Sequence, residues 1–390
     1  MPAFQRDRLT WLMYLMLASY AFFQAAPGPI MPFLGDELDL SYTVRGFHFS
    51  AFATGMVISG LFGARVSTAL TRQRTFWLGG AVMIVGTIVF MLGQQAPITI
   101  GSMFLMGISG SLTLVVIQAV LSDYHGSQRA TALTEANVVA SMGASVSPLI
   151  IGVVPGWRLA IVAGIVYWSM LAAFYGRVKI PRRKIVDNNP HNASSRRLPR
   201  LYWGYWLVTV LSVSIEWTIV FWAAEFLEKN AGVSKNTAAL IMGAYFLTIV
   251  TGRIIGSALT RRISTPVLHI ASFVMVGIGF IPFWTAPGAI VSIGGLIFMG
   301  FGVGNLFPMT LALATGAVGD DQADAASGRI SLAAGLAILI APQILGSLAD
   351  ATGIVEAYGV VAVLIIGALS CAVWVNRLAQ DTGVLSTESV

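Results

Sequence analysis

The chain has 390 residues, of which about 10% are charged, whereas an ordinary soluble domain has roughly a quarter. Hydrophobic residues make up 56% of the sequence. A core of this length could not bury so much apolar surface, so the chain must be surrounded by lipid. A soluble enzyme is therefore not expected. The net charge of +6 comes from basic residues between the apolar runs, where they indicate membrane topology rather than a nucleic-acid-binding face.

Twelve apolar runs follow one another along the chain, separated by polar or Gly/Pro-containing segments. They are too long and too continuously apolar for the alternating strands of a membrane β-barrel. They must be helical because lipid offers no partner for backbone N–H and C=O groups. We therefore expect an all-α membrane protein with spans at 9–34, 45–70, 76–94, 97–122, 131–154, 157–176, 201–227, 236–260, 266–286, 288–317, 325–349 and 353–376.

Basic residues predict the orientation of these spans. With the N-terminus in the cytoplasm, most Lys and Arg residues fall on the cytoplasmic side, so we expect both termini there. The longest polar stretch, 177–200, contains eight Lys or Arg residues. We expect it to be a cytoplasmic linker between an N-terminal six-helix bundle at 1–176 and a C-terminal six-helix bundle with a short tail at 201–390. Only four basic residues, Arg45, Arg158, Lys229 and Lys235, fall on the outer side. Three more, Arg65, Arg253 and Arg329, lie within spans near their cytoplasmic ends.

The two halves carry an internal repeat. Residues 68–72 recur at 257–261, residues 147–152 at 341–346 and residues 104–107 at 297–300, at offsets between 189 and 194. An even number of spans separates the matches, so the two bundles should have the same orientation. Such repeats are typical of a rocking transporter with a binding site between its halves.

Small or short polar residues recur at every fourth position in four spans, and such stripes let helix backbones approach closely in lipid. Because the stripes fall at equivalent places in both halves, we expect the four helices to form the seam where the halves meet. Ordinary packing within each bundle is the alternative. The stripes are Gly55, Ser59 and Gly63; Asn137, Ser141 and Ser145; Thr248, Gly252 and Gly256; and Ser327, Ser331 and Gly335.

With these features, the sequence resembles the major facilitator superfamily over essentially the whole chain. The resemblance rests on the six-plus-six layout, the basic central linker, the basic turns after 45–70 and 236–260, Gly156-Trp157-Arg158, and the glycine-rich run at 300–308. It implies a fold of two parallel six-helix bundles in which the first, fourth, seventh and tenth helices line a central cavity. Ser67 and Thr68 stand where the family usually has an aspartate, which argues against a proton-driven drug antiporter.

Polar residues in the cavity-type helices are the predicted solute-binding residues, because each would be costly to leave in lipid. Pro27-Gly28-Pro29 and Pro308 are expected to interrupt their helices and permit bends at the cavity wall. A single Trp could instead pack in the core or at the lipid interface. The predicted residues are Tyr20, Gln24, Ser109, Ser111, Thr113, Gln118, Glu216, Trp217, Trp222, Asn305 and Thr310.

Glu216 is the predicted proton-coupling residue. It lies roughly 22 Å along the helix that begins at Leu201, past the midplane of the membrane. No Lys or Arg occurs elsewhere in the span 201–227, so its charge must be compensated by another helix, the solute or a proton. A structural carboxyl group hydrogen-bonded to a neighbouring helix is the alternative.

Glu135 and Arg253 are predicted to form a cytoplasmic gate, an ion pair across the halves when the carrier faces outward. Each lies one to two turns from the cytoplasmic end of its helix, where an unpaired charge is expensive. Arg329 is the competing partner of Glu135. Contact of each charge with water or lipid headgroups alone is the alternative.

Together these features predict a secondary active transporter that moves a small organic solute by alternating access and is coupled to protons through a carboxylate. Passive uniport, or a membrane sensor on a transporter scaffold, is the alternative. The sequence has no nucleotide-binding loop, metal-ligand set or catalytic cluster, so we expect no enzyme activity and no cofactor. The expected partners are the solute, a proton and membrane lipid, with no nucleic acid and a monomeric chain. One central carboxylate favours a neutral or cationic solute over a polyanion.

Overall fold

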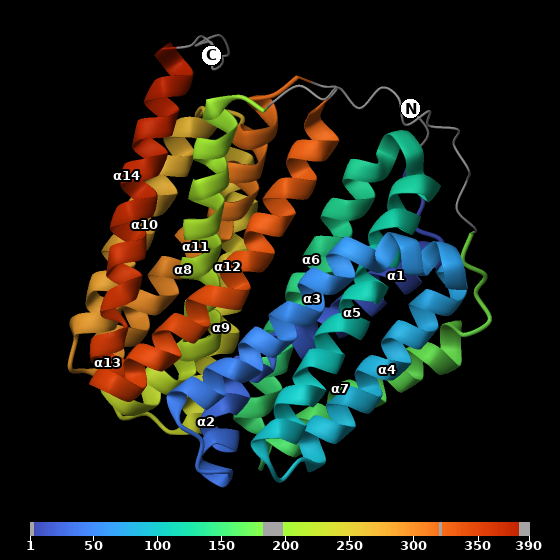
Figure 1. The fold of residues 1–390 in the computed structure, drawn as a ribbon, viewed down its shortest axis with the longest axis horizontal. Coiled ribbons are helices and arrows are strands. Elements are labelled where there is room, and N and C mark those ends of the chain that lie inside the picture. Colours follow the sequence, from blue (N-terminus) through green and yellow to red (C-terminus); the bar gives the residue numbers. More distant parts are fainter. Residues whose placement is uncertain (1–3, 182–197, 320–321, 382–390) are drawn as a thin grey trace. The chain divides into compact units, whose positions relative to one another are not determined.

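The computed structural model describes residues 4–181, 198–319 and 322–381, and all regular secondary structure in these ranges is helical (Figure 1). Within them, eleven stretches are long and apolar enough to cross a membrane. The longest, Ala96–Val153, contains two crossings, because helices α5 (Ala96–His125) and α6 (Arg129–Val153) are separated by the short turn η1 (Gly126–Gln128). The twelve predicted membrane crossings are therefore confirmed.

The chain divides into two compact units. Unit 1 consists of residues 1–186 and 234–244, and unit 2 consists of residues 187–233 and 245–390. Helix α9 (Lys235–Leu259) belongs to both, since its residues 235–244 pack with unit 1. The predicted bundle boundaries at 176 and 201 stay predictions, and residues 182–197 of the predicted linker lie outside the described residues.

The remaining helices follow the predicted spans to within a few residues at most ends. Two predicted spans, 9–34 and 353–376, each correspond to two consecutive helices. Unit 1 contains α1 (Arg8–Ala25), α2 (Pro27–Glu37), α3 (Tyr42–Leu70), α4 (Arg72–Leu92) and α7 (Trp157–Tyr175), and unit 2 contains α8 (Arg200–Ala231), α10 (Thr265–Thr285), α11 (Ala289–Gly316), α12 (Ala323–Thr352), α13 (Ile354–Ala357) and α14 (Gly359–Asp381).

Proline and a polar cap set the limits of the first span. The carboxylate of Asp7 accepts a hydrogen bond from the backbone N–H of Thr10 and so caps the N-terminus of α1. The helix is interrupted at Ala26, and α2 begins at Pro27, which has no N–H to continue the ladder. The predicted break in the first span is confirmed. The break predicted at Pro308 is wrong, because α11 continues through this residue to Gly316.

The small-residue stripes of α3 and α9 pack inside the units. A Cβ atom at Gly55 would overlap the backbone of α5 at Ile108, and the hydroxyl of Ser59 donates to the carbonyl of Ile108 at 2.5 Å. In unit 2, a Cβ atom at Gly252 would overlap the carbonyl oxygen of Phe301 on α11. The stripes of α3 and α9 therefore let α5 and α11 approach closely, as packing within each bundle requires, and a role of these two helices at the seam stays a prediction.

The stripes of α6 and α12 have different surroundings. The amide of Asn137 donates to the carbonyl of Leu133 on its own helix, and Ser141 donates to the carbonyl of Asn137. On α12, Ser331 donates in the same way to the carbonyl of Ser327. These groups therefore form their hydrogen bonds within their own helices, and none of these bonds reaches another helix. A role of α6 and α12 at the seam stays a prediction.

Candidate functional site

Glu216 and Arg253 form a loose ion pair inside unit 2. The Nη2 atom of Arg253 on α9 lies 3.7 Å from Oε1 of Glu216 on α8, and the Nε atom of Arg253 donates to the carbonyl of Gly304 on α11 at 3.0 Å. The side chain of Glu216 is 14% exposed and that of Arg253 is 37% exposed. The compensating charge that the sequence required for Glu216 is therefore supplied by another helix.

Glu216 lies in the middle of a long helix. At a rise of 1.5 Å per residue it is roughly 24 Å from the start of α8, whose length is about 48 Å. The nearby phenol of Tyr245 on α9 is fully buried and interacts electrostatically with both Glu216 and Arg253. Its hydroxyl has no hydrogen-bond partner among the described residues. The pair therefore lies beside an unsatisfied hydrogen-bonding group.

Two of the predicted residues of unit 1 lie together. The hydroxyl groups of Tyr20 on α1 and Ser111 on α5 are 3.2 Å apart, and both side chains are buried. The amide of Gln24 lies one turn further along α1 and donates to the sulfur of Met56 on α3 at 3.7 Å. These contacts place polar groups of α1 next to α5 and α3 inside unit 1.

Other predicted residues of α5 lie elsewhere. The hydroxyl of Thr113 donates to the carbonyl of Phe76 at 3.4 Å, which places it against α4 rather than beside Tyr20. Ser109 donates to the carbonyl of Leu105 on its own helix. Gln118 is exposed. A solute-binding role for these three residues stays a prediction.

The predicted residues of unit 2 make contacts between helices. The indole N–H of Trp222 donates to the carbonyl of Pro342 on α12 at 2.9 Å, and the ring is fully buried. Asn305 on α11 donates to the carbonyl of Gly252 on α9 at 3.0 Å. Thr310 lies 2.9 Å from the Nε2 atom of His269 on α10. Trp222, Asn305 and Thr310 therefore hold the helices of unit 2 together.

Trp217 is the neighbour of Glu216 in sequence and contacts another aromatic ring. Its ring centroid lies 5.1 Å from that of Phe221, one turn further along α8. Both residues precede the fully buried Trp222. This stretch of α8 therefore combines an ionisable group with large apolar surfaces.

Glu135, predicted as a gate residue, is bound by the N-terminal segment of its own unit. Its carboxylate accepts hydrogen bonds from the guanidinium of Arg6 at 2.5 and 2.8 Å and from the hydroxyl of Tyr14 at 3.2 Å. The guanidinium of Arg329, the predicted competitor, lies over the ring of Trp203, 5.9 Å from its centroid. The Glu135–Arg253 pair stays a prediction, and it would require both residues to exchange partners.

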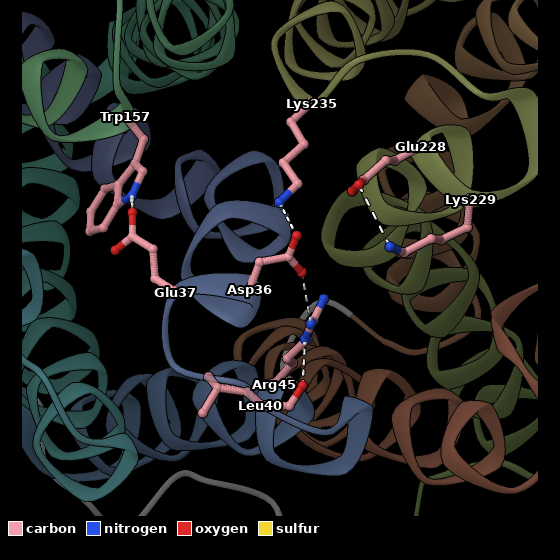
Figure 2. Close-up of polar contacts among 8 residues, drawn as sticks. All are labelled: Asp36, Glu37, Leu40, Arg45, Trp157, Glu228, Lys229 and Lys235. Atoms are coloured by element: carbon pink, nitrogen blue, oxygen red, sulfur yellow. Dashed lines mark hydrogen bonds and ion pairs between the residues drawn. The ribbon is translucent and has the colours of Figure 1, made fainter.

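A charged cluster that the sequence did not predict lies at the end of α2 (Figure 2). The carboxylate of Asp36 binds the ammonium group of Lys235 on α9 and lies 3.4 Å from Nη2 of Arg45 on α3. The Nε atom of Arg45 donates to the carbonyl of Leu40 at 3.0 Å. The cluster therefore joins α2, α3 and the start of α9 within unit 1.

The adjacent residue, Glu37, binds different partners, at the start of α7. Its carboxylate accepts hydrogen bonds from the indole N–H of Trp157 at 2.9 Å, as Figure 2 shows, and from two nitrogens of Arg158 at 2.9 and 2.7 Å. These contacts join α2 to the start of α7. Arg45, Arg158 and Lys235, three of the four basic residues that did not fit the predicted charge bias, thus have acidic partners in unit 1.

Glu225 is a second buried acid on α8 that the sequence interpretation missed. Its side chain is only 1% exposed, and it interacts electrostatically with the buried phenol of Tyr358. Glu228, one turn further, lies 3.6 Å from Lys229 (Figure 2). The sequence does carry a signal for Glu225, since it is an acid inside the apolar run 201–227. No cluster of metal-binding side chains occurs in the described ranges.

A family model for the Major Facilitator Superfamily matches residues 13–224 and 205–386. The chain belongs to the Major Facilitator Superfamily. It is 22% identical over 388 residues to the hexuronate transporter of Bacillus subtilis (strain 168), with 90% of each chain covered. An uncharacterised transporter of the same organism, YtbD, is also 22% identical, over 379 residues.

Solved structures of this superfamily have the same fold. A bacterial homologue of the human lysosomal transporter Spinster gives a TM-score of 0.78 at 13% identity, covering 95% of this chain and 97% of the other. A D-xylose-proton symporter gives a TM-score of 0.75 at 15% identity, covering 93% and 96%. The predicted fold and family are confirmed: the chain is an integral, multi-pass membrane protein of a transporter family and is not an enzyme.

Proposed function

We propose that this Major Facilitator Superfamily protein is a proton-coupled secondary active transporter of a small organic solute. The observation that carries the proposal is the position of Glu216, a partly exposed carboxylate halfway along a membrane-spanning helix. An ionisable group at this depth is expensive, and it is typical of ion and proton pathways. The names of two similar proteins, a hexuronate transporter and a D-xylose-proton symporter, support transport of organic solutes.

Glu216 is suited to bind and release a proton because its compensating charge is only loosely engaged. The separation of 3.7 Å from Arg253 exceeds the usual length of an N–H···O hydrogen bond. A small movement of α9 relative to α8 would therefore change how strongly the guanidinium favours the ionised carboxylate. Alternating access would supply such a movement, loading the proton in one state and releasing it in the other.

The remaining predictions complete this proposal. We place both termini and the linker at 177–200 in the cytoplasm, on the strength of the distribution of basic residues. We assign Tyr20, Ser111 and Gln24 of unit 1 to the solute path, since Tyr20 and Ser111 lie 3.2 Å apart and Gln24 is one turn further along α1. The Glu135–Arg253 pair remains the proposed gate of the outward-facing state.

Counterflow in proteoliposomes tests whether the chain is a carrier. The labelled solute is the compound that gives the largest thermal stabilisation of the purified protein, whatever its charge. A secondary active transporter should exchange internal unlabelled solute for external label and should accumulate the label when a pH gradient is imposed. Exchange without accumulation would indicate a uniporter, and binding without exchange would indicate a sensor.

A further inference from the structure

The guanidinium of Arg253 has unused hydrogen-bonding capacity. Its Nε atom donates to the carbonyl of Gly304, and its Nη2 atom lies 3.7 Å from Glu216, which is beyond hydrogen-bond distance. An arginine side chain has five N–H donors, so the two Nη groups keep donors for another acceptor. The side chain is 37% exposed, and a small molecule could therefore reach them.

Two further groups beside Arg253 lack strong partners. The carboxylate of Glu216 accepts no hydrogen bond from any of the described side chains, although its side chain is only 14% exposed. The buried hydroxyl of Tyr245 also lacks a hydrogen-bond partner there. Buried polar groups normally have partners, and leaving one without a partner is costly.

We propose that the transported solute is a small monocarboxylate whose carboxylate group binds Arg253 while Glu216 takes up a proton. The proposal rests on the proposed function and specifies its solute class. A planar carboxylate accepts two parallel hydrogen bonds from a guanidinium, which a hydroxyl or an amine cannot do. The sequence interpretation favoured a neutral or cationic solute because it placed no basic group near Glu216, and the position of Arg253 removes that reason.

Charge balance links the solute to the proton. Glu216 and Arg253 together carry no net charge when both are ionised. A monoanion binding alone would leave a net negative charge in a poorly solvated site, which is unfavourable. One proton on Glu216 converts its carboxylate to a carboxyl group and restores neutrality, while the solute stays ionised on Arg253. Anion and proton would therefore enter and leave together.

No other ionisable group is known to act on Glu216 among the described residues besides Arg253 and Tyr245. Helix α11, which packs on α8, has no ionisable residue in its sequence. Cys371 on α14 contacts the carbonyl of Gly204, about 18 Å along α8 from Glu216. The ionisable residues of α12, α13 and the rest of α14 lie toward helix ends, at Asp324, Arg329, Asp350, Glu356, Arg377 and Asp381.

Thermal unfolding of the purified full-length protein in detergent tests the solute class. The probes are matched compounds that differ mainly in charge: gluconate with glucitol, glucuronate with glucose and glucosamine, and lactate with 1,2-propanediol. A ligand that binds the folded state raises its apparent stability. We expect stabilisation by a carboxylate and not by its matched neutral or amine compound. Stabilisation by neutral compounds or amines only, or by no carboxylate at millimolar concentration, would overturn the proposal.

Proton uptake on binding tests the link to Glu216. In weakly buffered solution, a pH indicator should report one proton taken up for each carboxylate bound, at a pH where free Glu216 is ionised. In Glu216→Gln the carboxylate should still bind, but without proton uptake. Carboxylate binding that never takes up a proton in the unmodified protein would contradict the proposed coupling while leaving the solute class standing.

Arg253 variants test the binding group itself. Arg253→Gln should weaken carboxylate binding about tenfold or more, because a charge-assisted hydrogen bond is lost. Arg253→Lys should bind with intermediate affinity, since it keeps the charge but not the planar fork. The matched control is Arg65→Gln, which removes an arginine of α3 that lies over the ring of Phe62. The affinity of Arg65→Gln for the carboxylate should equal that of the unmodified protein.

One result would separate this proposal from the proposed function. If a neutral solute binds Arg253→Gln as tightly as it binds the unmodified protein, and its pH-driven accumulation still requires Glu216, the monocarboxylate proposal is wrong. Proton-coupled transport would then stand. If carboxylate binding to Arg253 and Arg65 variants is weakened equally, the effect is not specific to Arg253 and the proposal fails as well.

Discussion

Gly35 lies directly against the guanidinium of Arg45, so that a Cβ atom at position 35 would overlap the Cζ and Nε atoms of the arginine. The guanidinium is held there by the carbonyl of Leu40 and by Asp36. A glycine at this position therefore lets a buried basic side chain cross the end of α2 and reach its acidic partner.

Gly35→Ala should destabilise the protein by displacing Arg45. Overpacking of this kind typically costs about 1–3 kcal/mol. Thermal unfolding in detergent measures the effect. Gly60→Ala on α3 is the control, since a Cβ atom there would meet nothing within 4 Å. The control should be neutral or slightly stabilising, because alanine favours helix more than glycine does. Equal stability of the two variants would refute the packing account.

The contact between Arg6 and Glu135 predicts a rescue by charge exchange within unit 1. Glu135→Arg alone should lower stability, because two cations would face each other, and Arg6→Glu in the same chain should restore it. The side chains are 46% and 29% exposed, so solvent screens the pair and the stability changes should be small.

The proposed gate predicts that residues 135 and 253 approach each other in the outward-facing state. Transport by charge-exchanged variants cannot test this, because Arg253 also lies beside Glu216 and is assigned to the solute. In a background without Cys371, cysteines at positions 135 and 253 should form a disulfide bond under mild oxidation. Absence of this bond in the outward-facing state would count against a direct Glu135–Arg253 pair.

Asp7 predicts an acid-sensitive cap on α1. Burial raises its pKa, but hydrogen bonds from Tyr124 and Thr10 outweigh burial and hold the pKa below its ordinary value of 3.8. A lowered pKa contributes stability that is complete above the unfolded value and is lost as the pH falls through the folded value. Asp7→Asn keeps a capping side chain without the charge. The stability difference between the two proteins should therefore shrink below about pH 4. A difference that is constant from about pH 3 to 7 would contradict this account.

The order of the helices predicts that Asp39 and Ser264 lie on opposite sides of the membrane. An odd number of membrane-crossing helices, α3 to α9, separates these two exposed residues. In a background without Cys371, the single native cysteine, a cysteine at Ser264 should react from the cytoplasm and one at Asp39 from the opposite side. Labelling from the same side would contradict the topology, and the reversed pattern would contradict only the orientation.

The fold could be predicted from the sequence because each membrane crossing is a local property. A run of about 20 apolar residues is both necessary and nearly sufficient for a spanning helix. The break before Pro27 could also be predicted, since proline removes a backbone donor. At Pro308 the same reasoning failed, because the surrounding helix tolerates one lost hydrogen bond and continues.

The partners of polar residues could not be predicted in the same way. Asp36 and Lys235 are 199 residues apart, and their contact depends on which helix ends pack together. Arg253 was paired with Glu135 on the basis of depth alone, whereas its long side chain reaches Glu216. The stripe that contains Gly252 indicates close helix packing, but a sequence does not say which helix fills the groove.

The most direct test of the account is transport by Glu216→Gln in proteoliposomes, measured with the labelled solute that most stabilises the protein. The substitution keeps the shape of the side chain and removes its titration. We predict that accumulation driven by a pH gradient is abolished while counterflow is retained, because solute exchange needs no net proton movement. Unchanged accumulation in Glu216→Gln over the same pH gradient would contradict the account.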